Sequence, residues 1–128
     1  MEVLYYYFLG NWLLAEENEN CHKACNREGL ICKNKITHRQ NGDVDSSDKL
    51  IKLIQKRYDI KTLLSKPCIE TGDASAPLVT IKPSQHNWCM HTTVGKESEK
   101  EIGKKECSAK YDYPSHGTRR LCYCFYPQ

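Results

Sequence analysis

The sequence lacks the features of a membrane-spanning or nucleic-acid-binding protein. Its 128 residues include only two Phe and two Trp, and the mean hydropathy is −0.69. The one apolar run, at the N-terminus, is shorter than the roughly 20 residues that cross a bilayer. The formal net charge is only +3, from 19 basic and 16 acidic residues that are interspersed along the chain. We therefore expect no transmembrane helix in this chain, and no nucleic-acid partner, because nucleic-acid binding requires a stronger basic patch.

Motifs of catalysis and cofactor binding are also missing. The absence of a C-x2-C pair argues against a zinc module and against thiol–disulfide exchange. The sequence has no glycine-rich phosphate loop and no standard N-x-[ST] glycosylation site. Asp43 and Asp45 stand in a charged stretch that is typical of a solvated surface and not of an acid/base pair in a cleft. The sequence therefore predicts no catalytic residue, no cofactor and no metal site.

Eight cysteines are the dominant feature of what is present. They are Cys21, Cys25, Cys32, Cys68, Cys89, Cys107, Cys122 and Cys124. An even number of cysteines in a small chain is typical of disulfide-bonded domains in oxidising compartments. Each native disulfide contributes about 2–5 kcal/mol to a small secreted domain, which compensates for a limited hydrophobic core. All eight are predicted to form disulfides, and a zinc site that uses Cys89, His91 and His22 is the less favoured alternative.

The spacing of the outermost cysteines indicates which elements they join. Cys21 and Cys25 stand four residues apart, so they share one face of a helix. Cys122 and Cys124 stand two residues apart, so they share one face of a strand. Neither pair can bond comfortably within itself. We therefore expect the helix pair to be bonded to the strand pair, and the other four cysteines to form two more bridges among themselves.

Two helices are expected from the rest of the pattern. One begins near Cys21, after Asn18 or Asn20 as its cap, and ends at Gly29. The other covers residues 47–58, where apolar residues such as Leu50 recur at helical spacing. Burial of that apolar face in the core is favoured over a role as a membrane-surface helix, because the face is short and weakly apolar.

Strands are expected at residues 78–81, near 88–90 and at 119–126, where apolar and polar residues alternate. In the last of these, Leu121, Tyr123 and Phe125 are predicted to face one way and the cysteines the other. Residues 95–106 are charged and lack apolar periodicity, so they are expected to form a mobile surface loop. The predicted fold is a small α+β, disulfide-rich domain with two short helices packed on a small antiparallel sheet.

The N-terminal segment, residues 1–15, has two interpretations. Its apolar run has the length of a signal-peptide core, and Ala15 could precede the cut. Glu2 stands where a basic residue is usual, however, and Leu13 replaces a small one. The segment is therefore either a signal peptide or the remnant of an upstream domain. Residues 16–128 form the cysteine-rich module in both cases.

Several short motifs together resemble one known family. Cys21 and Cys25, followed by Glu28-Gly29-Leu30-Ile31-Cys32, resemble the start of the cysteine-rich C-terminal module of N-acetylglucosaminyltransferase V. Pro77-Leu78-Val79 with Pro83 and Cys89 resembles its central stretch, and Glu106-Cys107-Ser108-Ala109 with Arg119-Arg120-Leu121-Cys122-Tyr123-Cys124 resembles its ending. The resemblance covers about residues 21–125, and all eight cysteines have counterparts in order. Tyr123 departs from the family, which has proline there. Residues 95–106 form a longer insertion, and further family cysteines are missing after Cys124.

The resemblance implies a module of the secretory pathway, in the Golgi lumen or outside the cell. That family transfers β-1,6-linked GlcNAc from UDP-GlcNAc to N-glycans without a metal, but its catalytic domains lie upstream of the module and are absent here. No catalytic role is therefore carried over to any residue. The first expectation is a structural module whose partner is the catalytic domain of a glycosyltransferase. The alternative is a stand-alone secreted binding protein whose partner is a glycoprotein. A patch with Tyr111, Tyr113, His116 and Arg119 can either bind glycan or cover the cysteine core.

Overall fold

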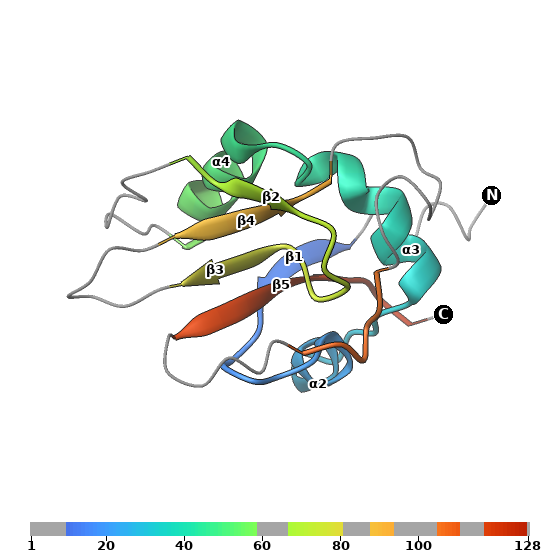
Figure 1. Cartoon of the computed structure of the whole chain (residues 1–128). Helices are drawn as coiled ribbons and strands as arrows, with labels where there is room; N and C mark the ends of the chain where they lie inside the picture. Colours follow the sequence, from blue (N-terminus) through green and yellow to red (C-terminus); the bar gives the residue numbers. More distant parts are fainter. Residues whose placement is uncertain (1–9, 59–66, 81–87, 94–104, 111–116, 128) are drawn as a thin grey trace.

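The computed structural model describes residues 10–58, 67–80, 88–93, 105–110 and 117–127 (Figure 1). Within these residues, five strands form one sheet in the order β1-β5-β3-β4-β2. The strands are β1 (Asn11–Leu14), β2 (Ile69–Thr71), β3 (Leu78–Thr80), β4 (Cys89–Thr92) and β5 (Thr118–Cys124). Neighbours are antiparallel, except that β2 runs parallel to β4. The sheet is therefore mixed, and the predicted purely antiparallel sheet is wrong in this respect. The sequence did not indicate β2, because this strand has only three residues and no alternation of buried and exposed positions.

Three α-helices and one short 3-10 helix accompany the sheet in the described residues. They are α2 (Cys21–Arg27), α3 (Asn34–Arg39), η1 (Gln40–Asp43) and α4 (Ser47–Tyr58). The expected cap and end of α2 are confirmed: the Asn20 side chain accepts a hydrogen bond from the backbone N–H of Lys23, and Gly29 has a φ of +73°. The sequence gives no sign of α3, because Ile36 and Thr37 are its only buried residues and two positions do not make a helical period.

Strand β5 separates the interior into two clusters of buried side chains. Leu121, Tyr123 and Phe125 belong to an apolar cluster on one face of the sheet. Cys122 and Cys124 belong to a second cluster, rich in cystines, on the other face. The predicted alternation along this strand is confirmed, and it follows from the two-residue period of a β-strand.

The helices cover both faces of this sheet. Figure 1 shows α2 on one side of the sheet and α4 on the other. Leu50 and Ile54 of α4 are buried in the apolar cluster, which confirms the predicted packing of this helix in the core. Cys21, Ala24 and Cys25 of α2 are buried in the cystine cluster. The predicted α+β, disulfide-rich fold is thus confirmed. No helix in the described ranges is long and apolar enough to span a bilayer.

Strand β1 lies at one edge of the sheet and contributes to both clusters. Trp12 and Leu14 are buried in the apolar cluster, whereas Leu13 packs against the cystines. Ala15 is fully buried, and its backbone N–H donates to the carbonyl of Arg120 at 2.8 Å. The folded unit therefore includes residues on both sides of position 15, where the sequence placed a boundary between segment and module.

Candidate functional site

Two parallel disulfides join α2 to β5. Cys21 is bonded to Cys122 and Cys25 to Cys124, and the Cα atoms are 5.3 Å apart in both bridges. This spacing lies within the usual range for disulfides, so the helix and strand meet without distortion of the backbone. The predicted cross-pairing of the C-x3-C helix with the C-x-C strand is confirmed.

The other four cysteines form the two remaining bridges. Cys32 is bonded to Cys107, and Cys68 is bonded to Cys89. All eight cysteines lie in the described ranges and none is free. Because Cys89 is consumed in a disulfide, the alternative of a zinc site at this position is wrong. Across the described ranges, no group of three His, Cys, Asp or Glu residues is placed to hold a metal ion.

A buried guanidinium lies beside the cystine cluster. Arg120 of β5 is only 2% exposed, and its guanidinium donates to the carbonyls of Ala109 at 2.6 Å and Ala74 at 3.3 Å. A longer contact, 3.5 Å, joins it to the carbonyl of Cys107. Burial lowers the pKa of Arg120 to about 10, so this group remains charged at physiological pH. The guanidinium therefore holds together segments that are far apart in the sequence.

A second buried cation binds the segment at residues 73–74, which Arg120 also contacts. Lys105 is 2% exposed, and its ammonium donates to the backbone carbonyl of Asp73 at 3.1 Å. Burial, together with the charge of Arg120, lowers the pKa of Lys105 to about 8. Burial alone would raise the pKa of the Asp73 carboxyl. Hydrogen bonds from Ser75 and the charges of Lys105 and Arg120 lower it by more, so this pKa lies below its ordinary value. Both cations thus bind backbone carbonyls inside the protein.

The sequence pattern indicates the burial of Arg120 but not that of Lys105. Arg120 has the same parity along β5 as Cys122 and Cys124, so the alternation already places it on the buried cystine face. Lys105 stands in the stretch interpreted as a mobile surface loop. For this residue that interpretation is wrong, because its ammonium is held by a carbonyl 32 residues away in the sequence. Residues 95–104 lie outside the described residues.

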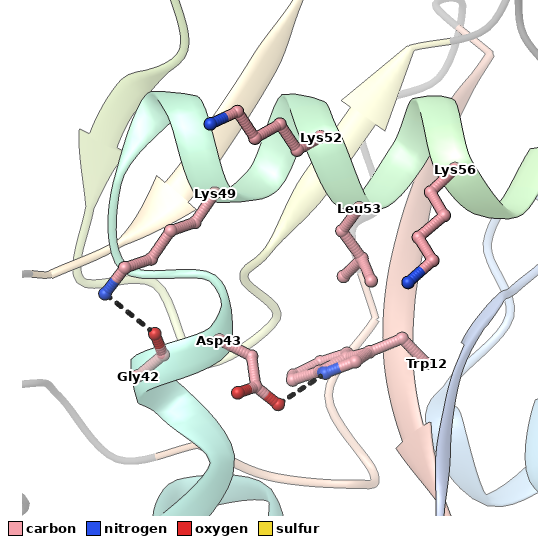
Figure 2. Close-up of a pocket in the computed structure, with 7 residues that line it drawn as sticks. All are labelled: Trp12, Gly42, Asp43, Lys49, Lys52, Leu53 and Lys56. Carbon is pink, nitrogen blue, oxygen red and sulfur yellow. Dashed lines mark hydrogen bonds between the residues drawn. The ribbon is translucent and has the colours of Figure 1, made fainter.

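A hollow opens on the opposite side of the sheet, between β1, η1 and α4. Its volume is about 430 Å³, and Figure 2 shows the residues that line it: Trp12, Gly42, Asp43, Lys49, Lys52, Leu53 and Lys56. The indole N–H of Trp12 donates to the Asp43 carboxylate at 3.0 Å. The Trp12 ring also packs edge-to-face on Tyr123, with ring centroids 5.4 Å apart. The floor of the hollow is therefore fixed by an aromatic pair and a carboxylate.

Tyr123 occupies the position at which the resembled family has proline. Its ring is buried under Gly10, where an added Cβ would lie 2.5 Å from the ring. Burial raises the pKa of the Tyr123 phenol, and the charge of Asp43 adds to this, whereas a hydrogen bond from the Gly10 backbone opposes it. This departure from the family pattern thus supports the aromatic floor of the hollow.

The lysines of α4 differ in their partners. The ammonium of Lys49 donates to the Gly42 carbonyl at 3.0 Å and forms an ion pair with Asp45 at 2.9 Å. Lys52 and Lys56 are exposed, and no hydrogen bond or ion pair involves either ammonium in the described part of the chain. Figure 2 shows Lys56 and Leu53 extending from the helix toward Trp12.

The remaining sequence candidates are only partly placed. Tyr111, Tyr113 and His116 lie outside the described residues. Arg119 is described, and its Nε donates to the Ala15 carbonyl at 2.6 Å, so this side chain braces β1. His91 is nearly buried, with Nδ1 2.6 Å from the Thr92 carbonyl.

Comparison with known proteins shows no family for this chain. The chain matches no protein-family model, and no curated protein matches it. The function is therefore inferred from the chain's own residues and from the motifs that resemble N-acetylglucosaminyltransferase V.

Proposed function

We propose that this chain is a cysteine-rich module of a Golgi glycosyltransferase that adds β-1,6-linked GlcNAc branches to N-glycans. Its role is structural, and it is not catalytic by itself. The transfer reaction belongs to upstream catalytic domains that this chain does not contain. The module supplies a disulfide-bonded unit that packs against those domains.

One observation carries this proposal: residues that produce the resemblance build most of the cystine cluster. Cys21 and Cys25 of the first motif are bonded to Cys122 and Cys124 of the last motif. Arg120, also in the last motif, is buried and binds three backbone carbonyls. Motifs that build a scaffold are what relatives with a common structural module retain, so the convergence of these motifs supports a shared fold.

The buried charges support a structural role over a catalytic one. A catalytic acid or base must reach the proton that it transfers. Arg120 and Lys105 are each 2% exposed and are bound to carbonyls, so neither can reach a substrate. Four disulfides are compatible with a secreted or lumenal protein, because disulfides persist in oxidising compartments. Residence in the Golgi is part of the proposal.

A domain exchange tests the proposal. The chain replaces the cysteine-rich segment of an enzyme of that family, and the chimera is assayed for secretion and for transfer of GlcNAc from UDP-GlcNAc to an N-glycan. We expect transfer by the chimera and none by the isolated chain. Replacement of Cys21, Cys25, Cys122 and Cys124 by Ala is expected to abolish secretion of the chimera. The matched control is Lys23→Glu, at an exposed site, which is expected to leave secretion unchanged. Transfer by the isolated chain, or a secreted chimera without activity, contradicts the proposal.

A stand-alone secreted binding protein is the second candidate, and the four disulfides, which are typical of secreted domains, are the observation that favours it. The two candidates differ in the fate of β1. As a signal peptide, residues 1–15 are removed, and the folded unit loses the buried Trp12, Leu14 and Ala15. N-terminal sequencing of the protein from a secreting host distinguishes the two: a start at Glu16 supports a signal peptide, and a start at or before Asn11 supports the module of a larger protein.

A further inference from the structure

We propose that the hollow between β1, η1 and α4 is a docking site for an extended, acidic polypeptide segment that carries an apolar side chain. None of the residues that line the hollow belongs to the motifs behind the proposed function, so this inference goes beyond it. The occupant is defined by two properties of the hollow: an apolar floor, and a rim whose positive charges exceed the negative ones among the residues that the structure describes.

The floor is formed by apolar surface that is recessed and preformed. The Trp12 ring is fixed by its hydrogen bond to Asp43 and its contact with Tyr123. Leu53 extends toward the same ring from α4 (Figure 2). At about 430 Å³, the hollow is within the range of ligand sites in proteins, roughly 300–1,000 Å³. A single apolar side chain of a partner therefore has a place to bind.

Among the described residues, positive charges along the hollow outnumber the negative ones. At the η1 end, Lys49 is paired with Asp45, and Asp43 is engaged by the indole of Trp12. Further along α4, the ammonium groups of Lys52 and Lys56 have no partner in the described residues. The rim thus carries two positive charges next to an apolar floor, which is complementary to acidic side chains that flank an apolar one.

The spacing of the lysines favours an extended chain over a single small anion. Lys52 and Lys56 are four residues apart, so their Cα atoms are separated by about 6 Å along the helix axis. Side chains two residues apart on an extended segment share a face and are separated by about 6.6 Å. Figure 2 shows the Lys52 side chain extending toward the start of α4 and the Lys56 side chain extending toward Trp12, so one phosphate or carboxylate contacts only one of the two ammonium groups. An extended segment with acidic residues at alternate positions has a carboxylate for each lysine. A flat anionic membrane does not reach the floor, because Trp12 is recessed and only 4% exposed.

The indole N–H of Trp12 provides a direct readout of occupancy. The chain has two Trp, so a ¹H–¹⁵N spectrum shows two indole signals, and Trp88→Phe assigns the one from Trp12. The probe is a blocked peptide, Glu-Leu-Glu-Leu-Glu, titrated into the full chain at low salt. We expect a saturable shift of the Trp12 indole signal that weakens at higher salt, because salt screens exposed charges. The signal of Trp88 is expected to stay in place.

Two double variants separate docking from general charge attraction. Lys52→Glu with Lys56→Glu is expected to raise the dissociation constant by about fivefold or more, since two attractive pairs become repulsive. The matched control is Lys23→Glu with Lys35→Glu, which changes the net charge equally at exposed positions of α2 and α3. This control is expected to bind like the parent chain. Equal weakening in both double variants overturns the proposal.

Other probes decide between the possible occupants. The peptides Gln-Leu-Gln-Leu-Gln and Glu-Ser-Glu-Ser-Glu lack the charges and the apolar side chains, respectively, and both are expected to bind at least fivefold more weakly. Equal binding of either peptide overturns the proposal. So does a saturable shift of the Trp12 signal with inorganic phosphate, with phosphatidylserine vesicles, or with increasing concentration of the chain alone, because each identifies a different occupant. Absence of any shift with Glu-Leu-Glu-Leu-Glu also overturns it.

Discussion

The two bridges between α2 and β5 are expected to impose nearly the same constraint on the unfolded chain, so that breaking one of them costs less than its sequence separation implies. Cys21–Cys122 spans a sequence separation of 101 residues, and Cys68–Cys89 spans only 21. If each bridge acted alone, loop-closure entropy would assign about 4.7 kcal/mol to the first and about 3.4 kcal/mol to the second. The longer bridge would then be the more important.

The neighbouring bridge reverses that order. With Cys25–Cys124 intact, the ring that Cys21–Cys122 closes contains only about eight residues, and its loss costs about 2.5 kcal/mol. No other disulfide shortens the ring of Cys68–Cys89, so its loss still costs about 3.4 kcal/mol. The four sulfur atoms are similarly buried, so losses of packing largely cancel in the comparison.

Guanidinium unfolding of two double variants measures the difference. Each pair of cysteines is replaced by Ala so that no free thiol remains, and unfolding is followed by tryptophan fluorescence. We expect Cys68→Ala with Cys89→Ala to lower the free energy of unfolding by about 1 kcal/mol more than Cys21→Ala with Cys122→Ala. A larger loss for the longer bridge would refute the argument that the parallel bridges share one constraint.

Three further predictions concern groups packed around this core. Arg120→Met leaves the half-buried carbonyl of Ala109 without its 2.6 Å donor, so we expect the free energy of unfolding in guanidinium to fall by about 2–4 kcal/mol. At the exposed Arg39, the same replacement is expected to change it by about 0.5 kcal/mol or less, and equal losses would contradict the role of the guanidinium. Gly10→Ala is expected to lower the melting temperature by crowding the Tyr123 ring, and to do so less in a Tyr123→Leu background; the same loss in both backgrounds would argue against that contact. The pKa of Lys105 is about 8 in the folded chain and has its ordinary value of 10.5 in the unfolded chain. Between pH 8 and 10 the unfolded chain therefore binds more protons at this residue, so the free energy of unfolding rises with pH. This rise is expected to flatten in Lys105→Met, and an unchanged slope would exclude Lys105 as its source.

The parts of the structure that could be predicted depend on local periodicity. Spacings of four and two residues placed Cys21 with Cys25 and Cys122 with Cys124 on shared faces, and that sufficed to pair the helix with the strand. The helical period of the apolar residues likewise located α4, with Leu50 buried. In each case the pattern lies within one element, and the partner element carries a matching pattern.

The parts that could not be predicted depend on contacts between distant segments. Lys105 belongs to a charged stretch, and only the approach of the loop at Asp73 buries it. The floor of the hollow requires Trp12 to meet Asp43, 31 residues further along the chain. No periodicity within a single element encodes such a meeting. The short elements α3 and β2 were missed for a related reason, because they bury too few side chains to leave a pattern.

The separation of scaffold and hollow has a consequence for how such a domain acquires function. The disulfides and Arg120 lie on the cystine face of β5, whereas Tyr123, on the opposite face, supports the hollow. Because successive residues of a strand point to opposite faces, the hollow can change without disturbing the cystine core. Tyr123 illustrates this: it stands between two bonded cysteines, departs from the proline of the resembled family, and fixes the ring of Trp12. Differences in binding between relatives of this domain are therefore expected at Tyr123 and along α4, and not in the motifs that identify the scaffold.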